Sequence, residues 1–235
     1  IAPFQGNALP VPVGRRKIVD RERRGFLFRL SLVGAVAACA LLFAGVALHA
    51  LARADEPLRG QQVIPDKAKW APSFLLQDQT GKLVGPQQLH GRVVVMAFLD
   101  SHCTRDCPVI GKEMAHVEQQ LGPSVPWTLL IVSVAPYTDS PASSAAFAMK
   151  SGWTGDWHWL FGSPTQLAKV WKDYGIWVKP TPTEIMHTAA VYVIGPDQYM
   201  RVADIVPFVP DDLIQSIHAL APHPGSGWLS WLPKI

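Results

Sequence analysis

The chain has 235 residues, 49% of them hydrophobic, and its 21 basic and 18 acidic side chains give a net charge of +3. Seven basic and two acidic side chains, a net +5, lie within residues 1–29, so the rest of the chain carries −2. A nearly neutral remainder of this kind argues against a nucleic-acid partner.

Residues 30–52 contain no charged side chain. As a helix this stretch would be about 34 Å long, enough to cross a hydrocarbon core of about 30 Å. A cleaved signal peptide is the alternative, because Ala50, Ala52 and Ala54 form an A-x-A pattern. The apolar core of such peptides is usually shorter, about 7–15 residues. We therefore predict a single transmembrane anchor that stays on the protein.

The basic residues precede this anchor, and the positive-inside rule then places the N-terminus in the cytoplasm. The larger part of the chain is expected in the periplasm, with the protein held at the inner membrane. We divide the chain into a basic cytoplasmic tail (1–29), the anchor (30–52), a linker (53–69), a compact domain (70–220) and a Trp-containing tail (221–235).

The compact domain shows alternating strand and helix patterns. In chain order we predict strands at 73–78 and 93–100, a helix at 107–121, a strand at 127–135, a helix at 140–150, a strand at 158–162, a helix at 163–175, a hairpin of 188–195 with 198–206, and a helix at 210–220. Strand–helix–strand–helix followed by hairpin–helix is the order of a thioredoxin-like α/β domain. About 150 residues suffice for one such core.

Cys103 and Cys107 lie where the strand at 93–100 gives way to a helix with Pro108 in its first turn, whereas Cys39 lies inside the anchor. A thiol at a helix N-terminus tends to have a lowered pKa. A structural disulfide is a weak explanation, because a bridge that closes three residues restricts little chain entropy. Thiol–disulfide exchange and metal binding remain, and soft thiolates select copper or zinc.

A metal site would need further ligands, and the chain has eight histidines. His187 is the best candidate, because we expect it to open the strand that runs beside the one leading to the cysteines. His102 adjoins Cys103, but neighbours in an extended segment point in opposite directions. The other histidines, His116 among them, are expected at turns, on surfaces or at the membrane end.

Three motifs in order carry a family resemblance. FLDSHCTRDCPVI, SVAPYTDSP and MHTAAVYVIGPD resemble the Sco/SenC family of membrane-anchored copper proteins, over about residues 70–220. The resemblance implies a copper ion held by Cys103, Cys107 and His187. It also implies a role in assembling the CuA centre of a haem–copper cytochrome c oxidase, by delivering copper or by keeping the cysteines of the target reduced.

The chain departs from that family pattern at two positions. Ala135 stands where an aspartate is common, and Met186 precedes the histidine where an aspartate is frequent. Lost carboxylates of this kind remove partners that typically tune metal affinity by about 10–100-fold. For Met186 we favour a packing role over a role as a weak metal ligand. Asp100 and Asp106, which flank the motif, are expected in solvent.

Three functions follow from these patterns. The leading one is a metallochaperone, not an enzyme, that passes copper to an oxidase subunit. The second is a thiol–disulfide oxidoreductase in which Cys103 attacks and Cys107 resolves. The third is a standing accessory subunit of a respiratory complex or supercomplex, with Trp-rich segments as contacts. Phosphate-loop and HExxH patterns do not occur, which sets aside the corresponding nucleotide enzymes and metalloproteases.

Overall fold

The computed structural model of the chain describes residues 39–44 and 57–222. The chain divides into two compact units, residues 1–51 and 52–235. In the first unit, residues 39–44 are helical. Nowhere in the described parts does a helix have both the length and the apolar character needed to cross a membrane. The expected cytoplasmic tail, most of the anchor and residues 223–235 lie outside the described residues.

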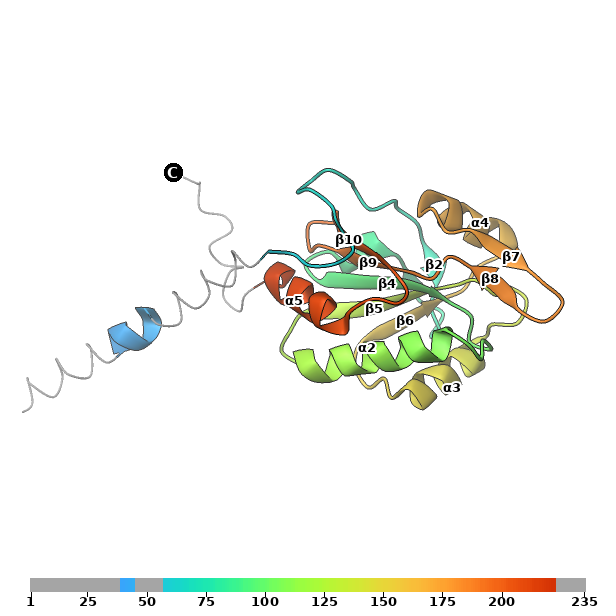
Figure 1. Cartoon of the computed structure of the whole chain (residues 1–235), viewed down its shortest axis with the longest axis horizontal. Coiled ribbons are helices and arrows are strands. Elements are labelled where there is room, and N and C mark those ends of the chain that lie inside the picture. The colour runs from blue at the N-terminus through green and yellow to red at the C-terminus, as the bar shows by residue number, and fades with distance from the viewer. Residues whose placement is uncertain (1–38, 45–56, 223–235) are drawn as a thin grey trace, which may run out of the picture. The chain divides into compact units, whose positions relative to one another are not determined.

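A six-stranded sheet forms the centre of the second unit, with strand order β1-β10-β9-β4-β5-β6. Its strands are β1 (Gln62–Val63), β4 (Val93–Leu99), β5 (Trp127–Ser133), β6 (Trp157–Leu160), β9 (Ala190–Ile194) and β10 (Met200–Ile205). β4 pairs with β5 in parallel and with β9 in antiparallel. Figure 1 shows how this order places β4 in the middle of the sheet.

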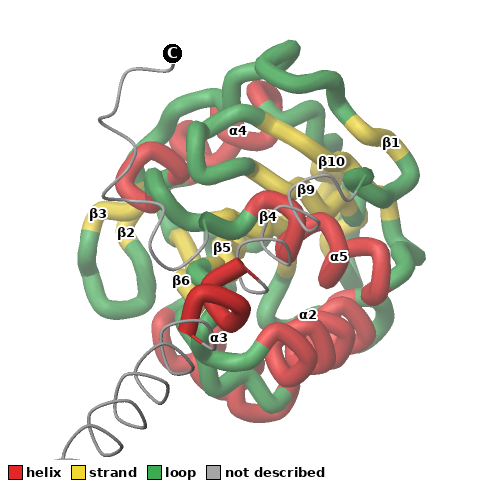
Figure 2. The backbone as a smooth tube through the Cα atoms, turned by 90° about the vertical axis from the view of Figure 1, so that its left-hand side faces the viewer, coloured by secondary structure: helices red, strands yellow, loops and turns green. Residues whose placement is uncertain are grey.

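Helices cover both faces of the sheet (Figures 1 and 2). The helices α2 (Cys107–Leu121), α3 (Pro141–Ser151) and α5 (Pro210–Leu220) contribute to one core, and α4 (Pro164–Asp173) to the other. Side chains of β4 alternate between the two: Val95 and Leu99 face the first core, and Met96 and Phe98 the second. Burial on both faces is why this strand is a continuous apolar run.

The predicted helices and the predicted hairpin of β9 and β10 are present, which confirms the mixed α/β, thioredoxin-like arrangement. Local signals set the helix starts. Pro108 occupies the first turn of α2, and Ser140 and Ser163 begin capping boxes in α3 and α4.

Two parts of the structure differ from expectation. The segment expected as a linker contributes β1, which pairs with β10, so the compact domain begins before residue 70. Between α4 and β9 the chain forms an additional two-stranded sheet, β7 (Val178–Pro180) with β8 (Ile185–His187). His187 therefore ends β8 and does not open β9. A second small sheet, β2 (Leu76–Gln77) with β3 (Leu83–Val84), precedes the short 3-10 helix η1 (Pro86–Leu89).

Candidate metal-binding site

The two cysteines lie where β4 ends and α2 begins. Cys103 is half-buried in the connecting loop, and Cys107 is the first residue of α2, with 1% of its surface exposed. Both are free thiols. The loop folds back on the strand, because the Cys103 backbone N–H donates to the carbonyl of Asp100 over 3.2 Å. One thiol is thus accessible and the other is enclosed.

The two thiols differ sharply in acidity. A hydrogen bond from the Cys107 side chain lowers the pKa of Cys103 to about 5, with help from the backbone N–H groups of Arg105, Asp106 and Cys107 against the opposing effect of burial. The pKa of Cys107 is raised, first by its hydrogen bond to Cys103 and then by burial. At neutral pH the arrangement is a Cys103 thiolate beside a Cys107 thiol.

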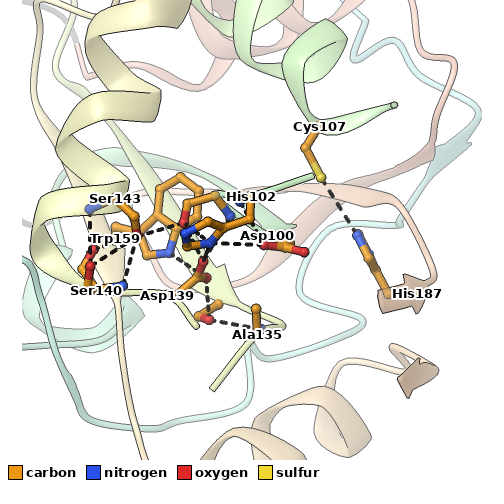
Figure 3. A network of polar contacts seen from close by, with 11 residues as sticks. Asp100, His102, Cys107, Ala135, Asp139, Ser140, Ser143, Trp159 and His187 are labelled. Atoms are coloured by element: carbon orange, nitrogen blue, oxygen red, sulfur yellow. Dashed lines mark hydrogen bonds and ion pairs between the residues drawn. The ribbon is translucent and has the colours of Figure 1, made fainter. Parts of the chain in front are cut away.

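His187 reaches this pair from the β7–β8 hairpin. Its Nε2 lies 3.9 Å from Cys107 Sγ, across 80 positions of sequence (Figure 3). The other ring nitrogen, Nδ1, lies 3.1 Å from the carbonyl oxygen of Thr188. Because a carbonyl can only accept, Nδ1 carries the proton, and the lone pair of Nε2 faces the cysteine. Metal-ligating histidines are held in the same way.

A small hollow of about 170 Å³ joins the three predicted ligands; its lining includes Cys103, Cys107, Trp177, Met186 and His187. Met186 is 47% exposed and Trp177 is 54% exposed. The Cys103, Cys107 and His187 ligand atoms do not all lie within 4.8 Å of one another. Shared binding of one ion by all three would therefore require these ligand atoms to move closer together.

An ion pair joins the cysteine loop to the hairpin that carries His187. Arg105 Nη1 lies 2.9 Å from both carboxylate oxygens of Glu184, in the turn between β7 and β8. Both residues also line the hollow. Nothing local in the sequence points to this pair, because its members are 79 positions apart.

Beneath the loop lies a buried carboxylate, Asp139, whose importance the sequence did not reveal. It accepts hydrogen bonds from the Ser101 backbone N–H, the Ser101 hydroxyl, the Ser133 hydroxyl and Trp159 Nε1 (Figure 3). Burial raises the pKa of Asp139, and the bonds from Ser101 and Ser133 oppose part of that rise. Asp139 thus ties the start of the cysteine loop to the sheet.

Two expectations about carboxylates have different outcomes. Asp106 is exposed, as expected. Asp100 is buried, with 8% of its surface exposed, and its expected place in solvent was wrong. The physical reason is a turn in which the Asp100 carboxylate accepts from the His102 backbone N–H over 2.8 Å. Ala135 is buried two positions beyond the end of β5 and offers no carboxylate.

Comparisons with known proteins agree with this architecture. The family model described as SCO1/SenC matches residues 63–221. A curated relative, the mitochondrial protein SCO2 homolog of Bos taurus, is 27% identical over 176 residues, which is 67% of this chain. The chain spans 64% of the length of that relative.

Two solved structures are similar. ScoI of Bradyrhizobium japonicum, solved with copper bound, is 26% identical with a TM-score of 0.57, over 65% of this chain and 99% of that one. A SCO1/SenC family lipoprotein of Bacillus anthracis is 24% identical with a TM-score of 0.60, over 67% of this chain and 98% of that one. The second likeness is evidence for the fold alone.

Proposed function

The chain belongs to the SCO1/SenC family, and on that premise we propose that it is a copper carrier whose ligands are Cys103, Cys107 and His187. The observation that carries this proposal is the approach of His187 Nε2 to Cys107 Sγ, with Nδ1 held by a backbone carbonyl. Two sulfur donors and one imidazole are a soft set, which favours copper, Cu(I) in particular. The related B. japonicum protein was solved with copper bound.

Each ligand has its own part in taking and releasing the ion. Cys103, a half-exposed thiolate, is the first group that incoming copper can reach. Cys107 gives up its proton on binding, which the metal makes favourable despite burial. His187 closes the site from the hairpin. Release to an acceptor proceeds by exchange, with acceptor ligands replacing these one at a time.

We further propose the CuA-bearing subunit of a cytochrome c oxidase as the acceptor, because the sequence motifs resemble those of the family with that role. The charge pattern around residues 30–52 supports an inner-membrane anchor with the copper domain in the periplasm. Membrane fractionation and protease treatment of intact spheroplasts test this placement. Recovery of the domain in the cytoplasm would contradict it.

The copper proposal is tested on the reduced full-length chain by elemental analysis. We expect about one copper per chain in the wild type and a much weaker copper affinity in His187→Ala. His116→Ala is the matched control, because His116 is exposed on α2 and lines neither hollow beside the cysteines. Equal affinity in His187→Ala and the control would reject the three-ligand site.

One observation favours a second function, thiol–disulfide exchange. The lowered pKa of Cys103 and the raised pKa of Cys107 are the asymmetry expected of an attacking and a resolving cysteine. This function predicts rapid reaction with a small disulfide and no dependence on His187. A chain that binds no copper and exchanges equally fast in His187→Ala would replace the carrier with a reductase.

A further inference from the structure

His102 is a histidine beside the cysteines that the three-ligand site does not use. Its Nδ1 lies 3.1 Å from the Ser101 hydroxyl, 3.8 Å from Asp100 Oδ1 and 3.7 Å from Asp139 Oδ1 (Figure 3). Across the described residues, Asp100, His102 and Asp139 are the one group of three whose ligand atoms all lie within 4.8 Å of one another. Three polar groups therefore surround a single edge of the imidazole.

These groups orient His102 and do not make a closed metal site. The Asp139 carboxylate already accepts four hydrogen bonds, including one of 2.5 Å from the Ser101 hydroxyl. Because the Ser101 proton goes to Asp139, the Ser101 oxygen is left to accept from His102 Nδ1–H. The lone pair of His102 is then on Nε2, at the opposite edge of the ring. The side chain of His102 is 53% exposed.

The residues around His102 also enclose space next to Cys103. A hollow of about 510 Å³ has His102, Cys103, Thr138 and Pro182 in its lining. Cys103 lines this larger hollow as well as the smaller one that holds Cys107 and His187. Cys103 is thus common to two hollows. We call the one with the buried Cys107 and the half-buried His187 the inner hollow, and the one with the exposed His102 the outer hollow.

We propose that Cys103 and His102 form an outer, transient copper-binding pair through which the ion passes between the inner site and the partner. This inference rests on the copper-carrier function. As the ion moves outward, the bond from copper to the His187 imidazole breaks and a bond to His102 Nε2 forms, while the bond to Cys103 persists. A ligand of the acceptor then replaces Cys107, whose thiolate takes a proton from water. Copper remains Cu(I), and each imidazole binds it through its unprotonated ring nitrogen.

The geometry gives His102 a role that differs from that of His187. His187 belongs to the inner hollow and sets the stability of the loaded state, whereas His102 belongs to the outer hollow and sets the rate of exchange. An intermediate ligand lowers the barrier because the ion never loses two ligands at once. Removal of His102 should therefore slow transfer more than it weakens binding.

The test uses the reduced full-length chain loaded with one Cu(I) and a chromophoric Cu(I) chelator as acceptor. His102→Gln is compared with His116→Gln, which changes the same residue type on the exposed face of α2. We expect about tenfold slower transfer in His102→Gln, in the range that ligand-supporting groups typically produce, and an unchanged rate in His116→Gln. Equal transfer rates in the two variants would overturn the inference.

A spectroscopic readout separates a ligand role from a structural one. X-ray absorption of His187→Ala, loaded at an excess of Cu(I) that offsets its weaker affinity, should still show one imidazole, and the double variant with His102→Gln should show none. Retention of an imidazole signal in the double variant would overturn the inference. Failure of the wild-type chain to bind copper would remove the carrier function together with this inference. If the wild-type chain binds copper, His187→Ala weakens this binding and His102→Gln changes neither the transfer rate nor the imidazole signal, only the outer pair is rejected and the carrier function stands.

Discussion

Cys107 and His187 lie 80 positions apart in the chain, yet Cys107 Sγ and His187 Nε2 are 3.9 Å apart. Two structural features produce this contact. The β4–β9 pairing brings the chain after His187 alongside the strand that leads to the cysteines, and the β7–β8 hairpin directs His187 toward the start of α2. The contact joins an enclosed thiol to an imidazole whose other nitrogen is already occupied.

The acidity of the two cysteines predicts a selective reaction. Iodoacetamide should modify Cys103 with a rate that is half-maximal near pH 5, because the pKa of that thiol is lowered to about 5. Cys107, with a raised pKa and 1% exposure, should react far more slowly. In the Cys107→Ala variant the pKa of Cys103, read as the midpoint of this profile, should rise toward the ordinary value of 9.0, because the Cys107 side chain is the largest cause of the shift.

Peptide mass spectrometry across pH 4–9 measures these rates and separates the two cysteines from Cys39. A Cys103 profile that stays unchanged in Cys107→Ala would show that the helix N-terminus, and not the neighbouring thiol, controls its acidity.

The Arg105–Glu184 ion pair should affect copper release and leave stability almost unchanged. Both side chains are partly exposed, so Arg105→Gln should change the free energy of unfolding by less than about 1 kcal/mol. Loss of the link between the cysteine loop and the hairpin should speed copper release to a chelator by several-fold.

Stopped-flow chelation measures that release rate. Lys169→Gln is the matched control, because it removes the exposed Lys169–Asp173 pair on α4. Identical release rates in Arg105→Gln and Lys169→Gln would show that the pair does not hold the hairpin in place.

Asp139→Asn should loosen the cysteine loop. The carboxylate of Asp139 now accepts hydrogen bonds from Ser101, Ser133 and Trp159. In Asp139→Asn an NH₂ group replaces one of the two accepting oxygens, so that it faces donors and leaves some of them without an acceptor. An unsatisfied buried polar group costs about 1–3 kcal/mol, and we expect a loss of that size in the free energy of unfolding. Hydrogen exchange at the Ser101 amide should rise as well. A stability loss without faster exchange at Ser101 would mean that Asp139 supports the sheet and not the loop.

Asp78 should stabilise the fold in a pH-dependent way. Burial raises its pKa, but hydrogen bonds from Thr80, His158 and Lys82 outweigh that effect, and the net pKa lies below 3.8, the ordinary value. The unfolded chain therefore binds the proton more readily than the folded one. The contribution is present in full above the unfolded pKa and is lost as pH falls through the folded pKa.

We expect Asp78→Asn to lower the free energy of unfolding by about 1–3 kcal/mol at pH 7. The difference from wild type should narrow below about pH 4. Urea denaturation at the two pH values measures it, with Asp211→Asn, at an exposed aspartate of α5, as the control. A difference that does not change with pH would assign the effect to packing and not to charge.

Local patterns in the sequence were enough to predict that Cys103 and Cys107 lie between a strand and a helix, and to predict most helix boundaries. These features depend on neighbours in the chain. The continuous apolar run of β4 indicates burial on both faces, and Pro108 marks the first turn of α2. The order of the three motifs also predicted His187 as a ligand, which stays a prediction. The SCO1/SenC match over residues 63–221 confirms the family.

Only the tertiary structure decided how these residues meet. β8 has three residues, none of them fully buried, so its pairing with β7 could not be read from an apolar pattern, and His187 was expected on β9 instead. Asp139 touches Ser101 across 38 positions, and Arg105 touches Glu184 across 79. Polar side chains of this kind leave no periodic pattern in the sequence, because sheet order and loop folding, and not local propensity, bring their partners within hydrogen-bonding distance.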